Sequence, residues 1–281
     1  MQAPVHQDIS PYEQQALADI AAWRQPDASW RAKASRSLAQ VWGAVSGQLH
    51  TLPGVEWTIE NVVSGLLELT NEMTQDSIWT DAILRDFVSN GHPVRALADI
   101  QRLDLEHVDT IMMGLDRKYI SLASAEGVAT GAAGAAGIVP DLVALVALNL
   151  RVAGETATYC GFDMQRPEER LFALQILDAV ARSGDSKREI TVAPVLRTAS
   201  AVARKTASGI AGQMGLGSAV EGAMRRLGMT LAQKKLTQLV PVTGALVGGG
   251  LNYLYTANVC RTCHYLYRER FLEAKYGSNQ G

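Results

Sequence analysis

Three polar side chains interrupt a predicted helix that otherwise consists mainly of leucine, valine and alanine. Arg151, Glu155 and Tyr159 stand at positions i, i+4 and i+8, so they lie on one face of that helix. A guanidinium such as that of Arg151 could bind an anion. If that face is buried, Arg151 and Glu155 must pair, because an isolated charge in the interior costs roughly several kcal/mol.

Four further polar residues are candidates for the same cluster, namely Glu126, Asp141, Lys235 and Asn252. One hypothesis is a buried ion-pair network that fixes the register of the packed helices. The other is a polar site in which Glu126 or Asp141 serves as general base or metal ligand, while Arg151 or Lys235 binds an anion.

The rest of the sequence shows no arrangement typical of nucleophilic catalysis. No Ser/His/Asp or Cys/His set indicates a nucleophile, and we predict neither a metal site nor a cofactor. The glycine runs lack the phosphate-binding and dinucleotide-binding patterns, so we expect them to serve helix packing. The histidines are scattered along the chain, at His6, His50, His92, His107 and His264.

Cys260, Cys263 and His264 match the C-x-x-C-H pattern of covalent haem attachment. Haem attachment through thioethers normally takes place outside the cytoplasm, and the beginning of the sequence shows no export signal. The pattern also falls inside a predicted helix, and a second C-x-x-C pair that would indicate zinc is missing. We therefore interpret the match as coincidental and the cysteines as packing residues.

The elements that must position these residues are all predicted to be helices. Ser10 and Glu13 form a capping box around Pro11, which predicts a helix over residues 11–23. No segment shows the alternation of a strand, so we expect an all-α, multi-helix bundle. Apolar spacing and breakers predict further helices over residues 28–49, 57–74, 78–89, from 104, 140–161, 167–181, 193–208, 218–239 and 241–276.

A run rich in glycine and alanine covers residues 127–139. Gly127, Gly131 and Gly134 fall on roughly one helical face, which Gly137 continues, and Glu126 is expected at the head of this glycine helix. A face without Cβ atoms lets another helix approach closely, which offsets a helix penalty of about 1 kcal/mol for each glycine. The run therefore predicts closely packed glycine-rich and alanine-rich helices.

Composition excludes several classes of protein. The 281 residues are 47% hydrophobic and 19% charged, which is enough apolar material for a large core and too much for a disordered chain. The formal net charge is −2 and no long basic run is present, so we expect no nucleic-acid binding. Three cysteines are ordinary for a reducing compartment, and with no export signal visible we expect a cytoplasmic protein.

Several stretches approach the length of a membrane span. Residues 206–220 and 236–260 carry no charge, and residues 127–150 carry only Asp141. Glutamine, asparagine, proline and Asp141 within these stretches suit helices buried in protein better than helices facing lipid. We therefore favour a buried bundle over stable spanning, with peripheral contact to the inner membrane open under both interpretations.

The order and spacing of several short motifs resemble the EcsC family over roughly residues 96–281. The motifs are residues 126–131, 138–141, Arg151 with Glu155, 159–163, 167–170, Lys235, 241–244 and Asn252. Residues 1–95 are then predicted to be an N-terminal helical extension within one continuous globule. The resemblance implies no reaction, because members of this bacterial family have none established; the family is named after an operon that also encodes an ABC transporter.

Two functional hypotheses follow from these observations. The first is a non-enzymatic helical accessory protein, close to a membrane and associated with transport or secretion machinery, whose partner is a membrane surface or a membrane protein. The alternative is a hydrolase, or a protein that binds an anion or metal ligand through the carboxylate and cation cluster. The sequence predicts no particular oligomeric state.

Overall fold

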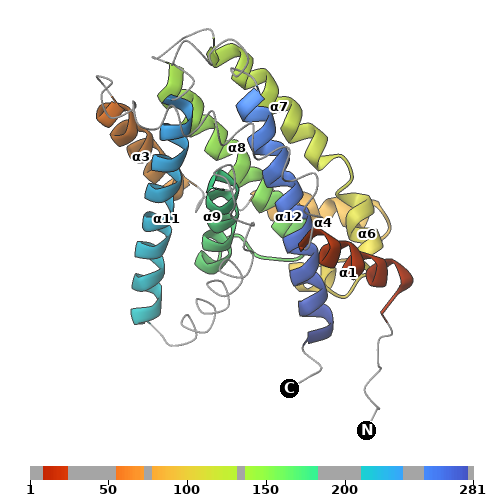
Figure 1. Cartoon of the computed structure of the whole chain (residues 1–281). Coiled ribbons are helices and arrows are strands. Elements are labelled where there is room, and N and C mark those ends of the chain that lie inside the picture. The colour runs from red at the N-terminus through yellow and green to blue at the C-terminus, as the bar shows by residue number, and fades with distance from the viewer. Residues whose placement is uncertain are drawn as a thin grey trace.

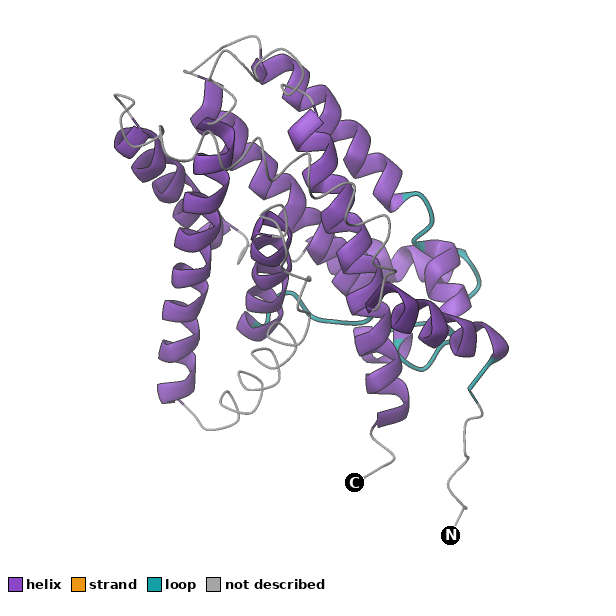
Figure 2. Ribbon diagram, in the orientation of Figure 1, coloured by secondary structure: helices purple, strands orange, loops and turns teal. Residues whose placement is uncertain are grey.

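All regular structure in the described part of the chain is helical. The computed structural model contains no strand among its described residues, which confirms the predicted all-α bundle (Figure 2). The predicted helices over residues 28–49 and 193–208 lie outside the described part of the chain. The structure describes residues 9–24, 55–72, 78–131, 137–182, 210–236 and 250–277.

The helix bounds agree closely with the sequence in several places and differ in others. The helices are α1 (Pro11–Arg24), α3 (Val55–Glu72), α4 (Ile78–Ser89), α5 (Leu97–Ile100), α6 (Leu105–Ile111), α7 (Leu115–Gly131), α8 (Ile138–Tyr159), α9 (Pro167–Arg182), α11 (Ile210–Leu236) and α12 (Gly250–Tyr276). Helix α11 begins eight residues earlier than predicted and includes Gly212, Gly215 and Gly217. Glycine weakens a helix without ending it, which explains this difference.

Local signals define the helix ends. The capping box is present, since the Glu13 backbone N–H donates to Ser10 Oγ at 3.2 Å and the Ser10 backbone N–H donates to Glu13 Oε2 at 3.3 Å. Gly91 and Gly161 follow α4 and α8 with φ of 86° and 80°, the left-handed conformation that glycine adopts without strain.

The position of Glu126 differs from the prediction. Helix α7 already begins at Leu115, directly after Gly114 with its φ of 91°, so Glu126 lies near the end of a helix and not at its head. The glycine run starts inside the last turns of α7, and Gly134 lies outside the described residues. The left-handed turn at Gly114 is the local cause, because it separates α6 from α7.

Helix α8 lies at the centre of the bundle. It packs against α3, α7, α9, α11 and α12, and its buried side chains include Leu142, Leu145, Val146 and Leu150 (Figure 1). The ends of α7 and α11 and the beginnings of α8 and α12 lie together at the top of Figure 1. The N-terminal helices pack onto later ones, since α3 contacts α11 and α8 while α1 contacts α12 and α6.

Candidate functional site

Three of the predicted cluster residues meet inside the bundle. Asp141 stands in the first turn of α8, Lys235 in the last turn of α11 and Asn252 in the first turn of α12. Lys235 Nζ lies 2.7 Å from Asp141 Oδ2 and donates to Asn252 Oδ1 at 3.1 Å, while Asn252 Nδ2 donates to Asp141 Oδ1 at 3.1 Å. We call these three residues the interior triad.

A glycine and a carboxylate on α7 border the interior triad. A Cβ atom on Gly127 would lie 3.0 Å from Asn252 Nδ2, so the absence of a side chain lets α12 approach α7 at this point. Burial, followed by the nearby charge of Asp141, raises the pKa of Glu126, whereas Lys235 acts in the opposite direction. Four of the seven predicted residues therefore lie together, with Asp141, Asn252 and Glu126 around Lys235.

A second polar contact continues along the same pair of helices. Asn149 Nδ2 on α8 donates to Thr256 Oγ1 on α12 at 3.0 Å and also to the Leu145 carbonyl at 2.7 Å. Both Asn149 and Thr256 are fully buried. Neither residue could be selected beforehand, because one asparagine and one threonine within predicted helices form no recognisable motif.

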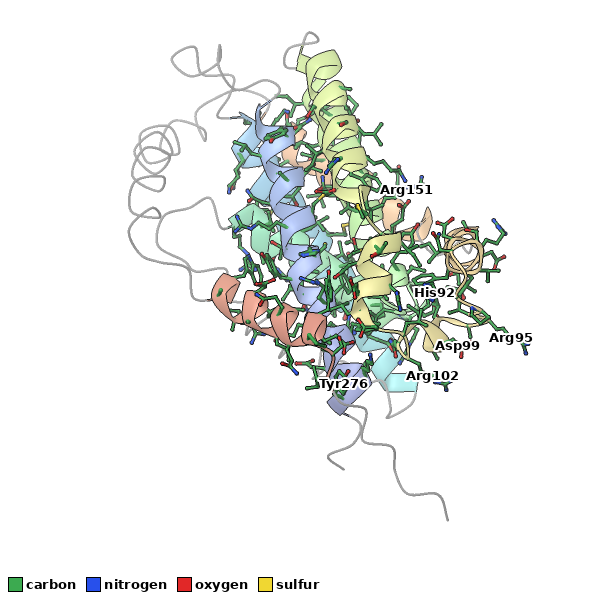
Figure 3. All side chains as sticks on the ribbon, turned by 90° about the vertical axis from the view of Figure 1, so that its right-hand side faces the viewer. His92, Arg95, Asp99, Arg102, Arg151 and Tyr276 are labelled. Atoms are coloured by element: carbon green, nitrogen blue, oxygen red, sulfur yellow. The ribbon has the colours of Figure 1, made fainter. Side chains whose placement is uncertain are left out.

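Glu155 forms a separate group with α7. It accepts from Tyr119 Oη at 2.6 Å and lies 3.2 Å from Lys118 Nζ and 3.4 Å from Arg151 Nε. Burial raises the pKa of Tyr119, and the hydrogen bond to Glu155 adds to this shift. Arg151 is half exposed and points away from the bundle in Figure 3, so the predicted pair with Glu155 forms at the edge of the interior.

The seven predicted residues therefore divide into separate groups. Asp141 and Glu155 are fourteen residues apart on α8, which corresponds to about 21 Å of helix rise. Tyr159, one turn further on, donates from Oη to Asp86 Oδ2 on α4 at 2.7 Å. Helical periodicity places residues on one face of a helix, but it does not show which neighbouring helix each of them meets.

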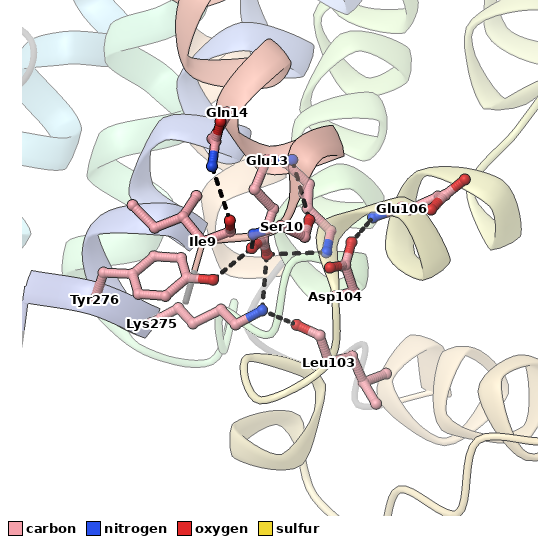
Figure 4. A network of polar contacts seen from close by, with 10 residues as sticks. Ile9, Ser10, Glu13, Gln14, Leu103, Asp104, Glu106, Lys275 and Tyr276 are labelled. Carbon is pink, nitrogen blue, oxygen red and sulfur yellow. Dashed lines mark hydrogen bonds and ion pairs between the residues drawn. The ribbon is translucent and has the colours of Figure 1, made fainter. Parts of the chain in front are cut away.

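An ionic contact that the sequence analysis missed joins the two ends of the chain (Figure 4). Glu13 is fully buried; it lies 2.7 Å from Lys275 Nζ, accepts from Tyr276 Oη, and accepts the Leu105 backbone N–H at 3.2 Å. Lys275 also donates to the Leu103 carbonyl at 2.8 Å. The capping box predicted Glu13 only as a helix cap. In the structure its carboxylate also binds α6 and α12.

Two arginines of α12 are held in similar buried pairs. Arg268 lies 2.8 Å from Asp109, which also accepts a hydrogen bond from Tyr12 Oη at 2.9 Å. Arg270 binds both carboxylate oxygens of Glu169, at 2.6 and 2.7 Å. The bidentate geometry of Arg270 orients its guanidinium strongly and fixes α12 against α9, while the single contact between Arg268 and Asp109 joins α12 to α6.

The cysteines of the haem-type pattern belong to the core. Cys263 is fully buried and Cys260 is 8% exposed. Burial raises the pKa of both thiols, that of Cys260 to about 12, which keeps them protonated and unreactive near neutral pH. Burial, with Arg268 nearby, lowers the pKa of His264. A porphyrin attached to both sulfurs would have to displace this packing, so the residues do not fit such a group.

The described residues contain no group of three or more histidine, cysteine, aspartate or glutamate side chains placed to hold a metal ion. Among the same residues, no helix combines the length and the apolar character that crossing a membrane requires. The geometry around the interior triad, in which Asp141 and Lys235 are buried and 2.7 Å apart, is that of a closed ionic contact between helices.

A model of the EcsC protein family matches residues 14–272. The chain belongs to the EcsC protein family. The matched range starts far ahead of residue 96, where the predicted resemblance begins, so the family pattern includes the helices from most of α1 onward. Membership was correctly predicted from the order of the motifs, but the predicted extent was too short at the N-terminal side.

Two proteins of Bacillus subtilis (strain 168) are similar in sequence to this chain. The uncharacterized protein YdbA is 27% identical over 175 residues, which are 62% of this chain and 62% of YdbA. Protein EcsC is 25% identical over 180 residues, which are 64% of this chain and 70% of that protein. The similarity thus spans less than two thirds of YdbA. No solved structure matches this chain.

Proposed function

We propose that this chain is a non-enzymatic helical accessory protein that works next to a membrane and acts by binding. The observation that supports this most is the closed interior triad. A catalytic acid or base must come within hydrogen-bonding reach of a substrate. Asp141 is 1% exposed and Lys235 is 8% exposed, and each already binds the other and Asn252. Such an arrangement suits a structural role.

The group around Glu155 supports the same conclusion. Its carboxylate is occupied by Tyr119, Lys118 and Arg151, so its oxygens already have hydrogen-bond or ionic partners. The alternative function, a hydrolase or a protein that binds an anion or metal ligand, draws on the same residues. It receives less support, because the two cations of the group around Glu155, Lys118 and Arg151, are both engaged by that carboxylate.

The family and the exposed surface support a proposal for the class of partner. The namesake operon of the EcsC family also encodes an ABC transporter, so we put forward a transport or secretion complex, or the membrane that holds it, as the partner. Large apolar side chains such as Trp57, Tyr253 and Leu254 are exposed on the described surface. Exposed aromatic and aliphatic side chains of this size suit contact with a lipid interface.

Flotation of the full chain with liposomes tests the proposal. Vesicles of phosphatidylcholine alone and vesicles that also contain phosphatidylglycerol are mixed with the protein and floated through a density gradient. We expect the protein to rise with at least one of the two vesicle types and to stay at the bottom without vesicles. Protein that stays at the bottom with both compositions overturns the membrane-proximal function.

A further inference from the structure

Helix α1 is attached to α6 and α12 through a polar contact that includes a histidine. We infer that His264 is a pH-sensitive switch for this attachment, so that acidification favours a state in which α1 is detached from the bundle. The inference goes beyond the proposed function and does not depend on it. Figure 1 shows α1 lying across α12 at the outside of the bundle, close to α6.

Four side chains from three helices form this contact. Arg268 of α12 lies 2.8 Å from Asp109 of α6 and donates to Tyr12 Oη of α1 at 3.3 Å. Tyr12 Oη in turn donates to the same Asp109 oxygen at 2.9 Å. One turn earlier on α12, His264 Nε2 lies 3.2 Å from Arg268 Nη1. We call His264, Arg268, Asp109 and Tyr12 the α1 joint.

The contact between His264 and Arg268 requires a neutral imidazole. A guanidinium has five N–H donors and no acceptor, so His264 Nε2 must accept this hydrogen bond through its lone pair. A proton on Nε2 removes the hydrogen bond and places two positive charges 3.2 Å apart. Protonation of His264 therefore acts directly on the arginine that holds Asp109 and Tyr12 together.

Charged groups of four helices face His264. Arg268 on α12 opposes protonation of the imidazole. The carboxylates that favour it are those of Asp109 on α6, Asp116 on α7 and Asp19 on α1. Burial and Arg268 outweigh these three carboxylates, and the pKa of His264 lies below its ordinary value. The balance of charge and burial thus favours the same neutral imidazole that the hydrogen bond requires.

Helix α1 contributes to the burial of this part of α12. The ring of Trp23 on α1 stacks on Tyr265, with the two centroids 4.9 Å apart. The Tyr265 ring in turn contacts His264 edge-on, with the centroids 5.2 Å apart. Detachment of α1 removes Trp23 and Tyr12 from this region and gives water access to it. Because burial is the largest cause of the lowered pKa of His264, detachment returns that pKa toward its ordinary value.

The direction of the pH effect follows from this difference between the two states. The pKa of His264 is lower with α1 attached than with α1 detached, so the detached state binds the proton more readily. The attached state keeps its full advantage above pH 6.5, the ordinary pKa of histidine. That advantage is lost as the pH falls from 6.5 through the lowered pKa of the attached state.

Hydrogen exchange of the full chain measures the switch. The α1 amides are followed by mass spectrometry at about pH 7.5 and about pH 5.5, and the rates are corrected for the intrinsic pH dependence of exchange. At about one pH unit below 6.5, a single histidine shifts the equilibrium between the attached and detached states by up to about tenfold. We expect the protection of α1 to fall several-fold on acidification and that of α3 to change less.

Two variants separate His264 from general effects of acid. His264→Gln keeps an acceptor for Arg268 but has no titratable group, so α1 should be protected nearly equally at both pH values. His92→Gln removes an imidazole from the turn after α4 and should lose α1 protection as the wild type does. Equal losses in wild-type protein and in His264→Gln, or no loss in wild-type protein, overturn the inference.

A titration of the wild-type protein decides the matter if His264→Gln does not fold. NMR of isotope-labelled histidine, with the His264 signals assigned through their sequence neighbours, gives the midpoint of protonation and the nitrogen that carries the proton. A midpoint below 6.5 with Nε2 unprotonated at neutral pH supports the switch. A midpoint at or above 6.5, or a proton on Nε2 at neutral pH, overturns it.

Discussion

At the scale of single residues, buried ionisable groups are held by partners that neutralise them. Asp141 and Lys235 form such a pair in the interior triad, and Glu13 with Lys275 forms another. Burying each charge is costly on its own, so removing one partner leaves the other without compensation. The interior triad therefore contributes to stability by holding together the three helices that supply its side chains.

Replacing Lys235 measures this coupling. Lys235→Met keeps a side chain of similar length but leaves Asp141 buried without its cation, so we expect the free energy of unfolding to fall by about 3–5 kcal/mol. Urea denaturation followed by circular dichroism gives this quantity. The matched control on the same helix is Arg225→Met, which breaks an exposed pair with Glu221 and should cost less than about 1 kcal/mol. Equal losses for both variants would argue against a buried ionic contact.

The residue types at the site were predictable, but their partners were not. The sequence predicted that Arg151 and Glu155 pair if their face is buried, and the structure places Arg151 Nε 3.4 Å from Glu155 although Arg151 is half exposed. Lys118 and Tyr119, which complete the group around Glu155, could not be chosen from the sequence. Their contact depends on how α7 packs across α8, and no local pattern in either helix encodes that crossing.

At the scale of helices, local sequence signals determined most of the described ends. Proline, the capping box and Asn90 followed by Gly91 placed α1 and α4 closely, because these signals act within one turn of the backbone. The helix bounds within the glycine run were harder to predict, since glycine both permits close packing and weakens a helix. The described part of α7 runs from Leu115 to Gly131, so it continues across the position where the sequence suggested that a helix begins.

Two glycine substitutions should act in opposite directions. Gly127→Ala places a Cβ atom 3.0 Å from Asn252 Nδ2, so we expect α7 and α12 to separate slightly at a cost of about 1–3 kcal/mol. Gly217→Ala in α11 meets open space and should stabilise the protein by up to about 1 kcal/mol through helix propensity. Thermal or chemical denaturation of the two variants checks the sign of each change. Stabilisation by Gly127→Ala would contradict the close approach.

At the scale of the whole molecule, helices from the beginning and the end of the chain share one structure. Helix α1 packs against α12, and α3 packs against α11, so the helices before residue 96 contribute to the same core as the later ones. The predicted boundary at residue 96 was drawn at the start of the predicted resemblance to the family. Long-range packing of this kind has no signature in local sequence patterns.

Glu13 is the residue with which to test this long-range connection. Glu13→Gln leaves Lys275 buried without a carboxylate, so we expect a loss of about 3–5 kcal/mol in the free energy of unfolding. Hydrogen exchange should show faster exchange of the α1 amides in particular. Asp19→Asn, a change at a less buried carboxylate of the same helix, serves as control and should leave exchange nearly unchanged. Unaltered protection of α1 in the Glu13 variant would show that apolar packing alone holds this helix.

The contact between Glu13 and Lys275 also sets an order of events during synthesis. The two residues are 262 positions apart, so a ribosome that adds roughly 5–20 residues per second makes the lysine about 13–52 s after the glutamate. Throughout that interval the Glu13 carboxylate of α1 lacks the lysine with which it pairs in the buried interior. Helix α1 can therefore form its buried ionic contact only after α12 has been synthesised.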